Sequence, residues 1–195
     1  RIAQLGSWEI DLATMLVTGS DELHRIFEIP RSDGPSAYQE FLARVHPEDR
    51  AIVDKTLNDA IGLRQQANLK HRLQMPDGRI KYVLEYCETE YGKDGEPLRV
   101  IGTSQDVSIQ HETDAQMQLL ASAVQHSGEA ILITDVSNRI ITVNPAFTRL
   151  TGYAAEEAIG QNPRFLSAGR TTPEEYGHMW SEIAERGFWQ GEIWD

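Results

Sequence analysis

The stretch from residue 102 to 124 divides the chain, because it begins as the end of a strand and continues as a helix. Residues 99–103 are rich in β-branched side chains, which favour a strand. Asp106 or Ser108 can then cap the first turn of a helix. The apolar or near-apolar positions that follow are three or four residues apart and form one narrow stripe: Ile109, Thr113, Met117 (or Gln116), Leu120 and Val124. Such a stripe suits a partner helix, and the alternative is a helix that lies on its own domain.

A chain of 195 residues exceeds a typical single domain, so two domains of roughly 100 residues are expected. There is no run of eighteen apolar residues, and the first residues lack the apolar segment of a signal peptide. The lone cysteine, Cys87, excludes an intrachain disulfide and a cysteine-based zinc cluster. We therefore expect a soluble, cytoplasmic fragment, with any membrane anchor outside it and no direct membrane contact within it.

The net charge is −12, and both halves of the chain are acidic. Direct binding of nucleic acid is not expected, because neutralisation of phosphates by basic side chains supplies most of that affinity. The chain also lacks a Walker loop, a Gly-x-Ser-x-Gly motif and a metal-binding His-Glu pair. The fragment is therefore expected to be neither an enzyme nor a metal protein.

The first half predicts an α+β domain, with two strands, several short helices and a three-stranded meander. Pro-Asp-Gly at residues 76–78 and Asp-Gly at residues 94–95 supply the turns of that meander. The helices are expected on one face of an antiparallel sheet. The predicted strands are residues 6–12, 16–18, 69–74, 80–91 and 97–105, and the predicted helices are residues 20–27, 36–45 and 47–61.

The second half repeats part of this order. A hairpin of residues 130–135 and 139–144 leads into a helix that Asn144 caps and Gly152 ends. A helical turn follows at residues 155–160. Residues 172–186 predict a longer helix with the apolar face Tyr176, Met179, Trp180 and Ile183, and residues 188–194 predict the start of a strand.

Several motifs of the first half resemble the PAS sensory domain: GSWEIDL at residues 6–12, SDELHRIF at residues 20–27, VHPEDR at residues 45–50, PDGR at residues 76–79 and VIGTSQDV at residues 100–107. The resemblance covers residues 1–108. Asp106, Val107 and Ser108 resemble the Asp-Ile-Thr signal-relay motif of that family. In this subfamily His46 opens a helix, so a capping role is favoured over a ligand role, and Cys87 is read as a strand residue.

The second half resembles a second PAS domain, through VNPAFTRLTGY at residues 143–153, EEAIGQNPRFL at residues 156–166 and GFWQGEIW at residues 187–194. Relative to the family, a middle strand has just begun and two long strands are missing. We therefore expect domain 1 at residues 1–108, a helical linker at residues 109–125 and a truncated domain 2 at residues 126–195. Missing strands would leave an exposed sheet edge.

The resemblance implies a ligand site between the sheet and the short helices. Residues 160–166 are similar to the flavin motif of blue-light LOV domains, but Pro163 stands where those domains carry the adduct-forming cysteine, which excludes that photochemistry. Non-covalent FAD in the second domain stays open, as does haem with His178 as its ligand, or no cofactor at all. The candidate pocket residues are Asn144, Phe147, Tyr153, Asn162, Arg164, Phe165, Trp180 and Trp189. Ordinary core packing is the competing interpretation of the aromatic members.

These resemblances imply the sensory input module of a bacterial signalling protein. Its output domain would follow at the C-terminal side and would synthesise or hydrolyse cyclic-di-GMP. The alternatives are a sensor module of a histidine kinase and a cofactor-free scaffold for dimerisation. In each case a homodimer through the linker helix is expected. The expected relay residues are Asp106, Val107, Ser108, Met117, Leu120 and Val124.

Overall fold

The computed structural model describes residues 5–31 and 34–193, and the N-terminal Arg1–Gln4 of the predicted first domain lie outside the described residues. Two units are distinguished, Arg1–Ala115 and Gln116–Asp195, and the boundary between them falls inside the helix α4 (Ser108–His126). Each unit is considered by itself below. Within the described part of the chain, no helix is both long enough and apolar enough to cross a membrane.

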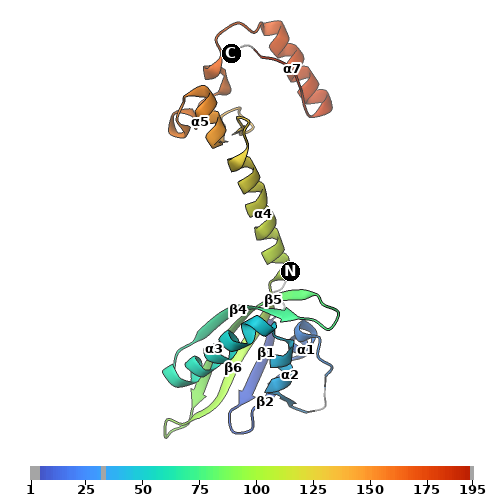
Figure 1. Ribbon diagram of the computed structural model, residues 1–195, viewed down its shortest axis with the longest axis vertical. Coiled ribbons are helices and arrows are strands. Elements are labelled where there is room, and N and C mark those ends of the chain that lie inside the picture. Colours follow the sequence, from blue (N-terminus) through green and yellow to red (C-terminus); the bar gives the residue numbers. More distant parts are fainter. Residues whose placement is uncertain (1–4, 32–33, 194–195) are drawn as a thin grey trace. The chain divides into compact units, whose positions relative to one another are not determined.

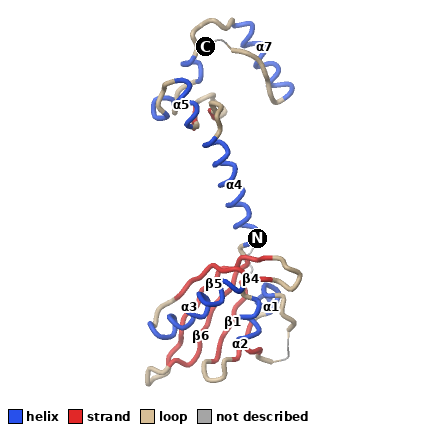
Figure 2. The backbone as a smooth tube through the Cα atoms, viewed as in Figure 1, coloured by secondary structure: helices blue, strands red, loops and turns tan. Residues whose placement is uncertain are grey.

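The first unit is built on one antiparallel sheet of six strands, in the order β3-β2-β1-β6-β5-β4 (Figures 1 and 2). Its central strand β6 is hydrogen-bonded to β1 on one side and to β5 on the other. The predicted meander is confirmed, and its turns place Gly78 and Gly95 at positive φ. The strands are β1 (Leu5–Asp11), β2 (Leu16–Gly19), β3 (Ser36–Ala37), β4 (Ala67–Gln74), β5 (Ile80–Tyr91) and β6 (Pro97–Asp106).

Three α-helices lie over one face of this sheet, as expected for the α+β class (Figure 1). The first, α1 (Asp21–Phe27), is capped by the hydroxyl of Ser20, which accepts a hydrogen bond from the Leu23 amide. The second, α2 (Tyr38–Arg44), starts later than predicted because Ser36–Ala37 pair with β2 as a short strand. The third is α3 (Arg50–Leu63).

The HPEDR motif forms a 3₁₀ turn, η1 (Pro47–Asp49), ahead of α3, where the sequence predicted one continuous helix. The side chain of His46 accepts a hydrogen bond from the Glu48 amide, which confirms the predicted capping role. Asp49 is held away from α3 because its carboxylate accepts hydrogen bonds from the amide and the guanidinium of Arg72 on β4. This contact joins the helical layer to the edge of the sheet.

The core of the first unit lies between the sheet and the helices. Leu73, Val83 and Val100 contribute one fully buried side chain from each of three neighbouring strands. The helices contribute Leu23, Ile26 and Phe27 from α1, Phe41 from α2 and Leu57 from α3. Along β4 the more buried positions alternate with more exposed ones, which is the period-two pattern of a strand with one buried face.

The second unit has a two-stranded sheet of β7 (Leu132–Thr134) and β8 (Ile140–Val143), which confirms the predicted hairpin with shorter strands. The helices that follow are α5 (Pro145–Thr151), α6 (Ala155–Ala158), the 3₁₀ turn η2 (Pro163–Leu166) and α7 (Pro173–Arg186). A small core gathers Ile140, Phe147 and Ala158, with Leu132, Val143, Phe165 and Leu166 packed against it.

The strand predicted at residues 188–194 is not formed over residues 188–193, and Trp194 lies outside the described residues. A strand exists only where its backbone groups pair with a neighbour. None of the described residues pairs with this segment. This alternating segment therefore does not form a β-ladder with any of the described residues.

We predict that Asp49→Asn lowers the free energy of unfolding of the first domain by about 1 kcal/mol near neutral pH. The hydrogen bonds from Arg72 lower the pKa of Asp49 from 3.8 to about 2. The charged carboxylate therefore stabilises the fold at pH values above the ordinary pKa of 3.8. That stabilisation is lost as the pH falls towards 2, where the native carboxylate also becomes protonated. Denaturant titrations at several pH values measure the difference.

Glu48→Gln is the matched control, since Glu48 also contacts Arg72 but its side chain is 73% exposed. We expect a change of less than about 0.5 kcal/mol for this variant. An Asp49→Asn effect that persisted unchanged at the lowest pH would show that charge on Asp49 does not stabilise the fold.

Candidate functional site

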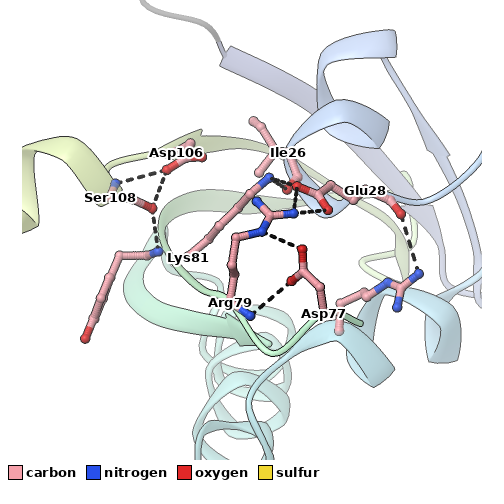
Figure 3. A network of polar contacts seen from close by, with 9 residues as sticks. Ile26, Glu28, Asp77, Arg79, Lys81, Asp106 and Ser108 are labelled. Atoms are coloured by element: carbon pink, nitrogen blue, oxygen red, sulfur yellow. Dashed lines mark hydrogen bonds and ion pairs between the residues drawn. The ribbon is translucent and has the colours of Figure 1, made fainter. Parts of the chain in front are cut away.

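The end of β6 is fixed to β5 where it passes into α4 (Figure 3). Val107 donates its amide hydrogen to the carbonyl of Tyr82 at 2.8 Å, and its side chain is buried. The hydroxyl of Ser108 accepts a hydrogen bond from the Tyr82 amide at 2.9 Å and donates one to Asp106 at 2.6 Å. The three residues predicted as the relay motif therefore form one hydrogen-bonded corner against the backbone of a neighbouring strand.

The first turns of α4 have a second contact with the sheet. The ring of His111 stacks on Tyr82 with centroids 3.7 Å apart, and its Nδ1 lies 3.1 Å from the Nζ of Lys70 on β4. Backbone and side-chain contacts thus meet at one residue of β5, Tyr82.

The predicted stripe of α4 is exposed. The side chains of Ile109, Met117 and Leu120 are 72%, 64% and 60% exposed, and Val124 is half-buried. None of the residues of α4 is buried. The sequence left two interpretations of this stripe open. A helix that packs on its own domain would bury the stripe, whereas a helix that pairs with a partner helix would expose it in a single chain.

An apolar cavity of about 70 Å³ lies between the sheet and the helices of the first unit. A site between the sheet and the helices was expected from the resemblance, but the candidate pocket residues were all placed in the second domain. Its walls come from β1, β2, β4, β5 and all three helices, with Trp8, Leu23, Phe27, Tyr38, Leu57 and Cys87 among its lining residues. Pockets for drug-sized ligands occupy roughly 300 to 1,000 Å³. A volume of about 70 Å³ matches a compact ligand of a few heavy atoms.

A chain of polar side chains crosses the sheet behind the cavity. The indole N–H of Trp8 donates to the hydroxyl of Ser104, and that hydroxyl donates to a carboxylate oxygen of Glu85, both at 3.0 Å. The other carboxylate oxygen lies 3.7 Å from Nε2 of His71, whose side chain is 1% exposed. That nitrogen has no hydrogen-bond partner among the described residues. These hydrogen bonds link β1, β6 and β5 in that order, and His71 of β4 lies next to the last member of the chain.

Two further groups line the cavity with altered acidity. Burial, followed by the charge of Glu85, raises the pKa of the Cys87 thiol to about 11. Burial and the hydrogen bond to Asp54 raise the pKa of the Tyr38 hydroxyl above its ordinary value. Both groups are neutral near pH 7, and Glu85 is the one acidic residue among the lining residues.

In the second unit the candidate residue Asn144 has a structural part. Its side-chain oxygen accepts hydrogen bonds from the amides of Ile131 and Phe147, and its nitrogen donates to the carbonyls of Val124 and Glu129. The side chain is buried and its amide is fully paired. A ligand contact by Asn144 would have to replace one of these bonds.

The other candidates fall into two groups. Phe147 and Phe165 belong to the small core, and the rings of Phe165 and Tyr153 meet edge to face with centroids 4.9 Å apart. Asn162 caps η2 by accepting from the amide of Arg164, whose side chain is exposed. The core cluster of described residues does not include Trp180, His178 or Trp189, and the side chains of the first two are exposed.

Comparison with known proteins follows this division of the chain. Residues 16–104 and residues 118–192 each match the family described as PAS fold. A probable diguanylate cyclase of Escherichia coli K12, DgcE, is 27% identical over 160 residues, which are 80% of this chain and 14% of that protein. A nitrogen fixation regulatory protein of Klebsiella oxytoca is 39% identical over 75 residues, which are 38% of this chain and 15% of that protein.

A solved structure is similar in fold. It is a sensory box histidine kinase/response regulator from Burkholderia thailandensis, with a TM-score of 0.54 at 18% identity over 64% of this chain and 93% of that one. The chain spans only about one seventh of the length of the two curated relatives. The two family matches together cover most of the chain, which therefore belongs to the PAS fold family and contains two PAS domains in tandem.

Proposed function

We propose that this chain is the sensory input part of a cytoplasmic signalling protein, in which a ligand in the first domain changes the position of α4. The observation that carries the proposal is the placement of the cavity and the relay corner in one small domain. The cavity is lined by β1, β4 and β5, and β5 also holds Val107 and Ser108 at the start of α4. A change in the cavity can therefore reach the helix through a single strand.

The output is proposed to be the synthesis or hydrolysis of cyclic-di-GMP by a domain on the C-terminal side. The similarity to the probable diguanylate cyclase supports this choice because it extends over both domains and the helix between them. The competing role is a scaffold that only dimerises. The exposed stripe of α4 is compatible with either role, so ligand response and dimerisation have to be measured separately.

We further propose a homodimer through the stripe of α4. We expect Leu120→Asp to weaken dimerisation by at least about tenfold, because a charge would be placed in an apolar helix interface. In the full-length protein the same variant should abolish the response of the output to its signal and leave the cavity unaltered. Light scattering and output assays measure the two effects.

Leu119→Asp is the matched control, since Leu119 is similarly exposed, at 70%, and lies beside the stripe. We expect it to leave the dimer intact. Equal effects at both positions, or a normal response of the Leu120 variant, would contradict the relay through this face of α4.

Asn144 is proposed to hold the last turns of α4 in the second domain, since it is bonded to the carbonyl of the relay residue Val124. Asn144→Asp keeps the capping oxygen but removes both donated bonds, so we expect a loss of about 1–3 kcal/mol in the stability of this domain. Thermal unfolding measures it. Asn162→Asp is the control, because the hydrogen bond by which Asn162 caps η2 uses only its side-chain oxygen, and an equal loss there would contradict this role.

The absorption spectrum of the freshly purified full-length protein separates the ligand hypotheses. FAD in the second domain would give a flavin band, and haem on His178 would give a Soret band. The small volume of the first cavity leads us to expect no chromophore there. A flavin or haem that remained with a fragment of the first domain alone would contradict that expectation.

A further inference from the structure

One wall of the cavity leads away from the sheet to a charged cluster. Leu23 and Phe27 of α1 line the cavity and are 1% and 3% exposed. Immediately beyond them α1 ends, and Glu28 adopts the left-handed conformation, with φ +52°. The last carbonyl groups of a helix lack partners within it and need them from elsewhere. The same helix therefore provides part of the cavity wall and, directly after Phe27, the cap residue Glu28.

Lys81 of β5 provides such a partner. Its Nζ donates to the carbonyl of Ile26 at 3.0 Å and forms an ion pair with Glu28 at 2.8 Å (Figure 3). The side chain is only 15% exposed, so water screens these contacts less than at an open surface. The hydrogen bond from Lys81 is also the main cause of the lowered pKa of Glu28. Lys81 thus holds both the backbone and the cap of α1.

The next residue along β5 is Tyr82, whose amide and carbonyl hold Ser108 and Val107. One peptide unit therefore separates Lys81, which is bonded to the end of α1, from Tyr82, which is bonded to the start of α4. Peptide units are planar and stiff, and this one is part of a paired strand. The end of α1 and the start of α4 are consequently fixed to the same short piece of backbone.

We propose that Lys81 is a positioning residue that couples α1, the movable wall of the cavity, to the first turns of α4. The inference deepens the proposed sensory function by assigning a route, which runs from α1 through Lys81 and Tyr82 to Ser108. It is separate from the polar chain of Trp8, Ser104 and Glu85, which crosses the strands behind the cavity.

Arg79 provides the comparison within the same cluster. It also forms an ion pair with Glu28, at 3.0 Å, but its side chain is 57% exposed and its other bonded partner is Asp77 in the adjoining turn. The side-chain hydrogen bonds of Arg79 go to the carboxylates of Asp77 and Glu28 and not to the backbone of α1. Removal of the Arg79 side chain therefore tests the ion pairing of Glu28 and leaves the hydrogen bond from Lys81 to the Ile26 carbonyl in place.

The experiment is amide hydrogen exchange at residues 111–115 of the whole chain, with small changes in the cavity wall in place of a ligand. Leu23→Val opens space on α1, and Leu57→Val opens a similar space on α3. We expect Leu23→Val to speed exchange at residues 111–115 by at least about twofold to threefold, the lower end of coupling between contacting residues. Leu57→Val should leave that exchange nearly unchanged.

In the Lys81→Met background the effect of Leu23→Val should disappear, whereas Lys81→Arg, which keeps the donors, and Arg79→Met should retain it. An undiminished effect in Lys81→Met overturns the proposal. If Lys81→Met unfolds the domain, Glu28→Gln replaces it: a reduced effect supports the route, and an unchanged one overturns it. This experiment uses neither a ligand nor the output domain, so a negative result overturns the route through Lys81 and leaves the proposed sensory function intact. A full-length protein without any signal response would instead refute the sensory function and leave the route through Lys81 intact.

Discussion

The pairing of β6 with both of its neighbours is the constraint on which the first domain depends. β6 is hydrogen-bonded to β1 and β5 over nearly its whole length, and it places Val100 and Ser104 in the interior with no exposed surface. Gly102 lies between them because the ring of Trp8 occupies the space where a Cβ would be. The chain leaves this strand directly into α4. The start of the helix is therefore hydrogen-bonded to the sheet through Val107 and Ser108, while none of the residues of α4 is buried.

Much of the fold was predictable from local chemistry. The Asp-Gly turns, the Ser20, Asn144 and Thr172 caps and the period-two strands each involve residues close together in sequence, so their physical cause is visible there. The strand expected at residue 188 was wrong because strand formation depends on a partner that none of the described residues supplies. The break between Pro47–Asp49 and α3 arises from Arg72, which is more than twenty residues away.

The candidate sites divide in the same way, into features that neighbouring residues predict and features that depend on residues far apart in the sequence. The relay corner was predicted at Asp106, Val107 and Ser108, and the structure adds its partner, the backbone of Tyr82. The resemblance predicted a ligand site between the sheet and the helices, but the residues that line this cavity were not predicted, because its volume is what remains after side chains from seven elements have packed. Lys81 was also missed: in sequence it is one charged residue in a strand. The alternation of side chains around Glu85 and Cys87 was the signal from which these two could have been assigned to the inner face of the sheet. It could not show that the core beside them contains an unfilled space.

The acidity of the cavity wall has a practical consequence for spectroscopy. With its pKa raised to about 11, Cys87 is a thiol and not a thiolate near neutral pH, and only the thiolate reacts readily with alkylating reagents. The chain has no other cysteine. A single cysteine introduced on the solvent side of α4 would therefore be the preferred site for a spin label or a fluorophore. Because Cys87 reacts poorly near neutral pH, such a label can report on the proposed pairing of α4 without prior removal of the native cysteine.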